Sequence, residues 1–167
     1  MEPTDRLAPV SAEIKVLGPG DETTLRGVAP DVFDHHVVPE LAAEFLADPR
    51  HHLAVAVASG RVVGFASAVH YIHPDKPPEL WVNEVGVVAN YRKRGIGRRL
   101  LEALFTVGRD LGCREAWVLT DRENEPAKRL YASAGGREPT GKPVMFEFSL
   151  GSDRVQEPLV TGSSGPA

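Results

Sequence analysis

The residues best suited to chemistry lie in the run 92–97, Arg-Lys-Arg-Gly-Ile-Gly, which follows an apolar stretch and precedes a long amphipathic segment. The first turn of a helix presents unpaired N–H groups and the positive end of the helix dipole, and both favour anions. Gly95 and Gly97 have no side chain, so an anion can approach the backbone closely. Three consecutive basic residues add positive charge. The run therefore suits a diphosphate.

Other interpretations of these glycines fit less well. A P-loop needs Gly-x-x-x-x-Gly-Lys followed by Ser or Thr, which the run lacks. A dinucleotide fingerprint needs a third glycine, and Leu100 occupies that position. From these residues alone, a basic turn that only starts a helix remains open.

The elements around the run alternate between strand and helix patterns. Ser59-Gly60 separates two apolar runs and indicates a tight hairpin turn. The order predicts a mixed α/β fold with a largely antiparallel first half and at least one strand–helix–strand crossover. We expect strands at 12–17, 53–58, 62–69, 80–88, 116–119 (buried) and 144–150, and helices at 21–28 (capped by Asp21), 41–47, 96–111 and 125–134.

The composition sets limits on the protein class. A length of 167 residues predicts one domain, which we place at 12–150, with a flexible arm at 1–11 and a disordered tail at 151–167. The net charge of −4 argues against a nucleic-acid partner and suits a cationic small molecule, although it is also an ordinary solubility surplus. The first ten residues do not form a signal peptide, and no apolar run reaches membrane-spanning length. We expect a cytoplasmic protein without a membrane partner.

A strand, an Arg-x-x-Gly-x-Gly turn, a long helix, a strand, Asn124 and a helix bearing Tyr131 together resemble the GNAT superfamily of N-acetyltransferases. The resemblance covers 12–150 and implies the GNAT fold, a central mixed, mostly antiparallel sheet flanked by helices and splayed at the acetyl-CoA site. It implies acetyl-CoA as co-substrate, no metal, and a strand edge that pairs with the pantetheine arm. Ala89 departs from the family, where proline is frequent, and this position only shapes the loop. The implied cofactor-binding residues are Val85, Gly86, Val87, Arg92, Lys93, Arg94, Gly95, Ile96, Gly97, Asn124 and Ala127.

Two side chains are candidates for proton transfer. The family places a tyrosine at Tyr131 near the thioester sulfur, which makes it the general acid; packing of its ring against the sheet is the alternative. Glu84 precedes Val85 among apolar or small neighbours, and alternation puts it on one face with Val82 and Gly86. It could accept the amine proton, hold a cationic substrate, or pair with a nearby Arg or Lys. Asn124 could contact the cofactor, cap a helix, or do both.

The resemblance implies an amine as acceptor, and one subgroup of the family is especially similar. Residues 33–34, 46–49 leading into 53–56, 62–66 and 144–148 resemble the class I aminoglycoside 3-N-acetyltransferases. This implies a polycationic amino sugar, a homodimer, and an acceptor site lined by Glu84, Asp34, Glu79 and Asp121. Another amine, such as a polyamine, an amino acid or a protein terminus, remains an alternative, as does a non-catalytic acyl-CoA-binding module.

The remaining reactive side chains have simpler interpretations. Cys113 is the single cysteine, so no internal disulfide or cysteine zinc site can form, and the direct transfer that the resemblance implies leaves it no covalent role. The six histidines include the pairs His35-His36 and His51-His52 and match no zinc spacing. We expect them at the surface or in packing, with His70 or His73 as a lesser candidate for lining the acceptor site.

Overall fold

A computed structural model describes residues 11–141, 144–148 and 150. The chain divides into two compact units, one through Arg137 and one from Glu138 onward. Every described helix and strand lies in the first unit. The strand predicted at 144–150 is wrong for residues 144–148 and 150, which form no strand. Alternating apolar residues are not sufficient, because a strand also needs a partner edge. The expectations for 1–10 and 151–167 concern residues outside the described ranges.

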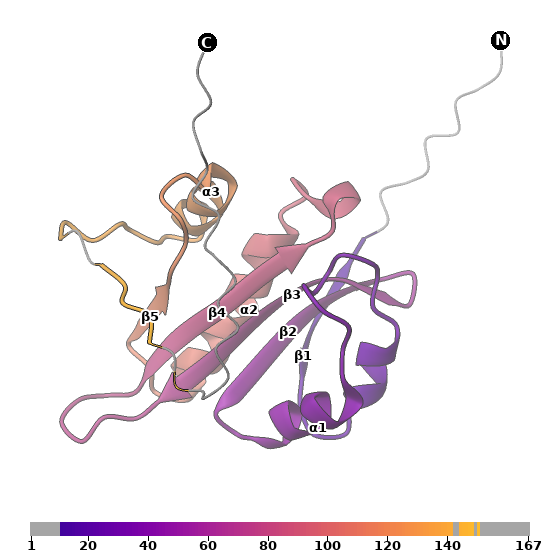
Figure 1. Cartoon of the computed structure of the whole chain (residues 1–167), viewed down its shortest axis with the longest axis horizontal. Helices are drawn as coiled ribbons and strands as arrows, with labels where there is room; N and C mark the ends of the chain where they lie inside the picture. Colours follow the sequence, from indigo (N-terminus) through magenta and orange to yellow (C-terminus); the bar gives the residue numbers. More distant parts are fainter. Residues whose placement is uncertain (1–10, 142–143, 149, 151–167) are drawn as a thin grey trace, which may run out of the picture. The chain divides into compact units, whose positions relative to one another are not determined.

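The described strands form one five-stranded sheet in the order β1-β2-β3-β4-β5 (Figure 1). The first four strands are antiparallel neighbours, and β5 runs parallel to β4. This arrangement confirms the predicted mixed, mostly antiparallel sheet. The strands are β1 (Glu13–Leu17), β2 (His51–Ala58), β3 (Arg61–Tyr71), β4 (Glu79–Val87) and β5 (Glu115–Val118).

A two-residue turn joins β2 to β3, as predicted. Ser59 and Gly60 both have positive φ, 50° and 74°. Two consecutive positive φ values suit the right-handed twist of a hairpin, and glycine adopts one of them without strain. The turn fixes the pairing of the two strands that form the centre of the sheet.

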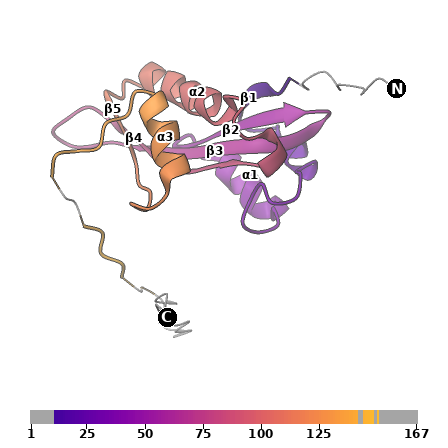
Figure 2. The same cartoon turned by 90° about the horizontal axis from the view of Figure 1, so that it is seen from above.

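Helices cover both faces of this sheet. The α-helices are α1 (Pro39–Ala47), α2 (Ile96–Asp110) and α3 (Glu125–Ser133), with short 3₁₀ helices η1 (Glu22–Arg26) and η2 (Ala89–Tyr91). Helix α2 packs across β1 to β4, and α1 lies on the opposite side of the sheet (Figure 2). No helix in these ranges has the length and apolar character required to cross a bilayer.

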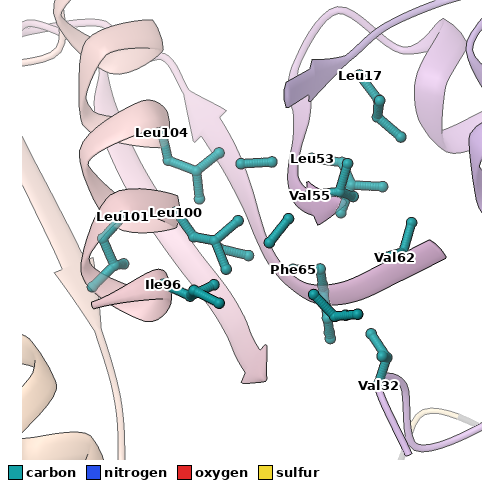
Figure 3. Packing of buried hydrophobic residues seen from close by; sticks show 14 of the residues in the cluster. Leu17, Val32, Leu53, Val55, Val62, Phe65, Ile96, Leu100, Leu101 and Leu104 are labelled. Atoms are coloured by element: carbon teal, nitrogen blue, oxygen red, sulfur yellow. The ribbon is translucent and has the colours of Figure 1, made fainter. Parts of the chain in front are cut away.

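The apolar spacing of α2 explains the core. Leu100, Leu101 and Leu104 recur at helical spacing and are each at most 1% exposed (Figure 3). Gly108 on the same helix lies against Leu80 of β4, where an added Cβ would be 3.2 Å from the leucine side chain. The close approach of α2 to β4 matters for function because both elements border the site described below.

Two local predictions are wrong. Asp21 does not cap a helix: its carboxylate accepts a hydrogen bond from the Gly18 N–H (2.9 Å), and the short helix that follows is 3₁₀. Strand β5 is mostly exposed, because it pairs only with β4 among the described residues.

Candidate active site

The sheet opens between β4 and β5. The two strands pair only from Glu79 opposite Glu115 to Val82 opposite Val118. Strand β4 nevertheless continues to Val87 and stays paired with β3. Beyond Val82, its other edge therefore faces no strand in the described part of the chain. The gap is the predicted splay, and the unpaired edge offers backbone N–H and C=O groups to an extended ligand.

A β-bulge lies where the two strands separate. On β3, Ala68 is opposite Val82 and the adjacent Ser67 is opposite Glu84, so Asn83 is an extra residue on β4. A bulge breaks the alternation of side chains along its strand. The residues after Asn83 are therefore turned relative to those before it.

The bulge changes the face on which Glu84 lies. Leu80 contacts Gly108 of α2, whereas an added Cβ at Gly86 would contact Phe65 and the Val32 carbonyl on the other face. Glu84 shares that second face with Gly86, two residues further along. The prediction that Glu84 shares a face with Val82 is wrong, because strict alternation does not survive the bulge.

Glu84 has an environment suited to proton transfer. It is exposed and forms no ion pair with any described residue, so the interpretation as half of an Arg or Lys pair is not supported. Partial desolvation, followed by the negative charge of Asp34, raises the pKa of its carboxyl. Asp34, a second predicted acceptor carboxylate, therefore lies close enough for its charge to act on Glu84.

Glu79 lies far from this pair. It begins β4, roughly 15 Å along the strand from Glu84, and is 6% exposed. It accepts hydrogen bonds from Tyr71 Oη (2.8 Å) and the Lys76 ammonium, and His73 Nε2 lies 3.5 Å away. The Lys76 and Tyr71 hydrogen bonds lower the pKa of Glu79 to about 2. The predicted acceptor role of Glu79 is corrected to a structural one, because its carboxylate is already occupied at the β3–β4 hairpin.

Glu79 should therefore control stability in acid. Its pKa in the folded state lies below that of an unfolded glutamate, so its stabilising contribution is complete above the unfolded value and is lost as pH falls toward 2. The thermal midpoint of the wild type should drop between pH 5 and 2 more steeply than that of Glu79→Gln, which should be the less stable protein at pH 7. Calorimetry at several pH values measures both. Parallel curves would contradict the structural role.

Asp121 lies on the other side of the gap. It is exposed, three residues beyond the end of β5, and its carbonyl oxygen accepts the Asn124 N–H (3.0 Å). The structure does not pair its carboxylate with Glu84. It can line the gap from the β5 side only.

The turn before α2 has the geometry expected for anion binding. Gly95 is the N-cap residue with φ 74°, and no side chain caps the helix. The first intrahelical bond runs from the Arg99 N–H to the Gly95 carbonyl (3.1 Å). The amides of residues 96–98 therefore have no partner within the helix. Gly97 serves packing as well, because a Cβ there would lie 3.1 Å from the Leu130 side chain of α3.

Two of the three basic residues have contacts of their own. Arg92 Nε donates to the Val87 carbonyl (2.7 Å), and the Arg94 guanidinium lies 5.3 Å from the Tyr91 ring centroid. Arg92 thus occupies one acceptor on the strand edge where the pantetheine arm was expected to pair. The remaining open edge lies nearer the bulge.

Helix α3 carries the other candidates. Asn124 Oδ1 accepts the Ala127 N–H (3.2 Å), so the helix-cap interpretation is confirmed. Tyr131 lines a pocket between α2, α3 and β5 with Leu80, Leu101 and Trp117. Burial raises the pKa of Tyr131, which keeps its hydroxyl protonated at neutral pH. Tyr131 shares its pocket with Leu80 on the α2 side of β4, whereas Glu84 lies on the opposite face of that strand.

The other reactive residues have structural surroundings. His52 Nε2 and His70 Nδ1 are 2.9 Å apart in stacked rings, and His51 packs on Phe45. Burial lowers the pKa of His52. His70 and His73 lie toward the Glu79 end of the sheet, away from Glu84, so they do not line the gap. No three His, Cys, Asp or Glu side chains within the described ranges could hold a metal ion. Burial also raises the pKa of the Cys113 thiol, which lowers its reactivity.

One loop beside the site contains more candidate residues than the sequence pattern indicated. Residues 31–38, here called the 31–38 loop, connect η1 to α1 and border a pocket of mixed charge. From this loop, only Asp34 was predicted to line the acceptor site. The sequence feature that could have indicated this pocket is the concentration of Asp and His residues between two short helices. The loop residues lining the pocket are Asp31, Phe33, Asp34, His35, His36 and Val37.

A pair of splayed strands next to a helix that begins at a glycine turn is characteristic of one class of acyltransferases. The model of the Acetyltransferase (GNAT) family matches residues 23–135, and the chain belongs to this family. It is 33% identical over 112 residues (65% of this chain, 62% of the relative) to L-2,4-diaminobutyric acid acetyltransferase of Streptomyces avermitilis. It is 31% identical over 93 residues (52% and 64%) to aminoglycoside N(6′)-acetyltransferase type 1 of Salmonella typhimurium.

A solved structure has the same fold. Aminoglycoside N-acetyltransferase AAC(6′)-Iy in complex with CoA superposes with a TM-score of 0.66 over 86% of this chain and 99% of that one. The identity is 23%, so this likeness bears on the fold. The chain spans about three fifths of the curated relatives it matches, for example 57% of an N-acetyltransferase of Mycobacterium tuberculosis and 62% of the Streptomyces enzyme.

Proposed function

We propose that this protein transfers the acetyl group of acetyl-CoA directly to a primary amine of a cationic small molecule, with an aminoglycoside as the first candidate. The observation that carries the proposal is the gap between β4 and β5, which is bordered by the amide-bearing start of α2 and by Glu84.

The start of α2 holds the pyrophosphate of acetyl-CoA. The amides of residues 96–98 donate to it, and the side chains of Lys93 and Arg94 add positive charge. The pantetheine arm lies along β4 at Val85 and Gly86, where it takes the place of an additional strand. The thioester then reaches the bulge at Asn83, next to Glu84.

The reaction needs a neutral amine and a protonated leaving thiol. Glu84 accepts a proton from the amine, directly or through water, and the nitrogen attacks the thioester carbonyl carbon. The C–N bond forms as the C–S bond breaks. The Tyr131 hydroxyl donates its proton to the departing coenzyme A sulfur. The raised pKa makes the Glu84 carboxylate a stronger base. The raised pKa of Tyr131 keeps its hydroxyl protonated at neutral pH, so that it has a proton to donate.

Asp34 supports a cationic acceptor. It lies close enough to Glu84 for its charge to raise the glutamate pKa, and two neighbouring carboxylates attract a substrate with several ammonium groups. Two relatives are named for substrates with more than one amine. The 3-N position of an aminoglycoside was the expected target, whereas the matched Salmonella relative is named for N(6′), so the experiment must distinguish the two positions.

A panel assay tests the proposal. Purified protein is incubated with acetyl-CoA and gentamicin-type compounds, diamines, polyamines, amino acids or peptides, and thiol release is followed. Turnover on an aminoglycoside is expected, and NMR of the product assigns the acetylated nitrogen. Turnover only on another amine would replace the acceptor class. Acetyl-CoA binding without any turnover would support the non-catalytic alternative.

The assembly and partners belong to the same proposal. We propose that the protein is a homodimer. Its binding partner is a small-molecule amine, and it binds neither nucleic acid nor a membrane. Light scattering during gel filtration measures the mass, and a mass near 18 kDa would show a monomer instead.

Gly95→Ala should weaken acetyl-CoA binding. A side chain at φ 74° strains the backbone and costs roughly 1 kcal/mol, and relief of that strain shifts the first turn of α2. We expect the KM for acetyl-CoA to rise several-fold while the KM for the amine stays constant. Gly112→Ala is the matched control, because Gly112 has φ 82° at the other end of α2. Equal changes in both variants would show that only stability had been affected.

A further inference from the structure

Gly86 lies where the 31–38 loop contacts the acceptor-side face of β4. An added Cβ would be 2.8 Å from Phe65 Cε1 and 2.9 Å from the Val32 carbonyl oxygen. Both distances are shorter than real Cβ contacts, and the carbonyl belongs to the backbone, so it cannot rotate away. A glycine within a strand often marks such a close approach of another chain segment. The loop can take this position only because residue 86 has no side chain.

The loop is anchored at this point by two neighbouring residues. Val32 is 4% exposed, and the Phe33 ring stacks on Phe65 with centroids 4.0 Å apart. Phe65 is itself 1% exposed and pairs with Gly86 across β3 and β4. Figure 3 shows Val32 near Phe65 and away from the leucines of α2.

The residue after this anchor is Asp34. It is exposed and lines the pocket of the 31–38 loop together with His35 and His36. Its charge reaches Glu84, which lies two residues before Gly86 on the same face of β4. The position of the Asp34 carboxylate relative to Glu84 therefore depends on how closely the loop packs at Gly86.

We propose that Gly86 is a positioning residue for the acceptor amine: its missing side chain seats the 31–38 loop on β4 and thereby holds Asp34 beside Glu84. This inference rests on the proposed acetyl transfer to an amine in the gap. It differs from a role of Gly86 in cofactor binding. The pantetheine arm pairs with the strand edge through backbone groups, which alanine retains, whereas the added methyl group points toward the loop.

The test is Gly86→Ala with the best amine found in the panel. The KM for the amine should rise about 10-fold as the loop moves away, a change at least threefold larger than any change in kcat or in the KM for acetyl-CoA. Gly18→Ala is the matched control, because no atom lies within 4 Å of a Cβ placed at residue 18. A rise in the KM for acetyl-CoA alone, or no change in the KM for the amine, would overturn the proposal.

A double-mutant cycle identifies the path of the effect. If Gly86 acts through Asp34, Gly86→Ala should change the KM for the amine less than threefold in an Asp34→Ala background. Fully additive effects would refute the coupling. Should Gly86→Ala fail to fold, Phe33→Ala is the second variant, because it loosens the loop without a substitution in β4. It should raise the KM for the amine similarly. An unchanged KM for the amine would then count against the proposal. Absence of wild-type turnover on every amine would instead refute the proposed function, and this inference with it.

Discussion

Glu84→Gln is expected to lower kcat by about 100-fold, within the range that general-base catalysis contributes. The amide retains the size of the side chain but cannot accept the amine proton. In the wild type, desolvation and Asp34 raise the Glu84 pKa, so the rate should rise with pH above the range in which an ordinary glutamate titrates. The variant should lose this limb of the pH profile. Steady-state rates between pH 4 and 9 measure both effects.

Stability separates this result from general damage. Because the folded-state pKa of Glu84 is raised, its ionised form is disfavoured in the fold once pH exceeds the unfolded value, and the neutral amide removes that cost. Glu84→Gln should therefore be at least as stable as the wild type at pH 7. Glu44→Gln, at an exposed position in α1, controls for loss of one negative charge. An unaltered pH profile in Glu84→Gln would show that the carboxylate does not transfer the proton.

Tyr131→Phe should lower kcat by about 10- to 100-fold and leave the KM for acetyl-CoA unchanged. Only the hydroxyl is lost, while the ring still packs between α2, α3 and β5. Burial raises the pKa of Tyr131, so the wild-type rate should fall at a pH above the ordinary tyrosine range, where the acid loses its proton. The variant should lack that descending limb.

Tyr71→Phe is the matched control, because it should change thermal stability and leave kcat unchanged, the reverse of what is expected for Tyr131→Phe. The Tyr71 hydroxyl donates to Glu79, far from the gap, so its loss should reduce thermal stability without reducing kcat. The Tyr131 hydroxyl makes no hydrogen bond to a described residue, so Tyr131→Phe should keep its melting temperature. If Tyr131→Phe turned over at the wild-type rate, another group or water would have to protonate the thiolate.

Local patterns in the sequence predicted the features that depend on a single segment. Ser59-Gly60 specified a hairpin because glycine suits the positive φ required there. The leucine spacing of α2 specified its buried face, and Arg92 to Gly97 specified the turn before it. Each of these features is determined within about a dozen residues, so the chain order alone was enough.

Features that depend on two segments were not accessible in this way. The bulge at Asn83 is a difference in register between β3 and β4, and no residue type in the sequence indicates its position. Gly97 faces Leu130, and Gly86 faces Val32, so the reasons for both glycines lie in distant parts of the chain. Glu79 was predicted to bind substrate because its acidic character is visible in the sequence, while its binding to Lys76 and Tyr71 is a property of the fold.

The short seam between β4 and β5 has a mechanical consequence. Four residue pairs join β5 to the rest of the sheet, whereas β3 and β4 share eight. A pantetheine arm along the free part of β4 would supply backbone partners that β5 does not provide. In that arrangement the bound co-substrate would also reduce the mobility of β5 and α3, the segment that carries Tyr131. Acetyl-CoA binding before the amine would then be favoured, which gives an obligatory order of addition.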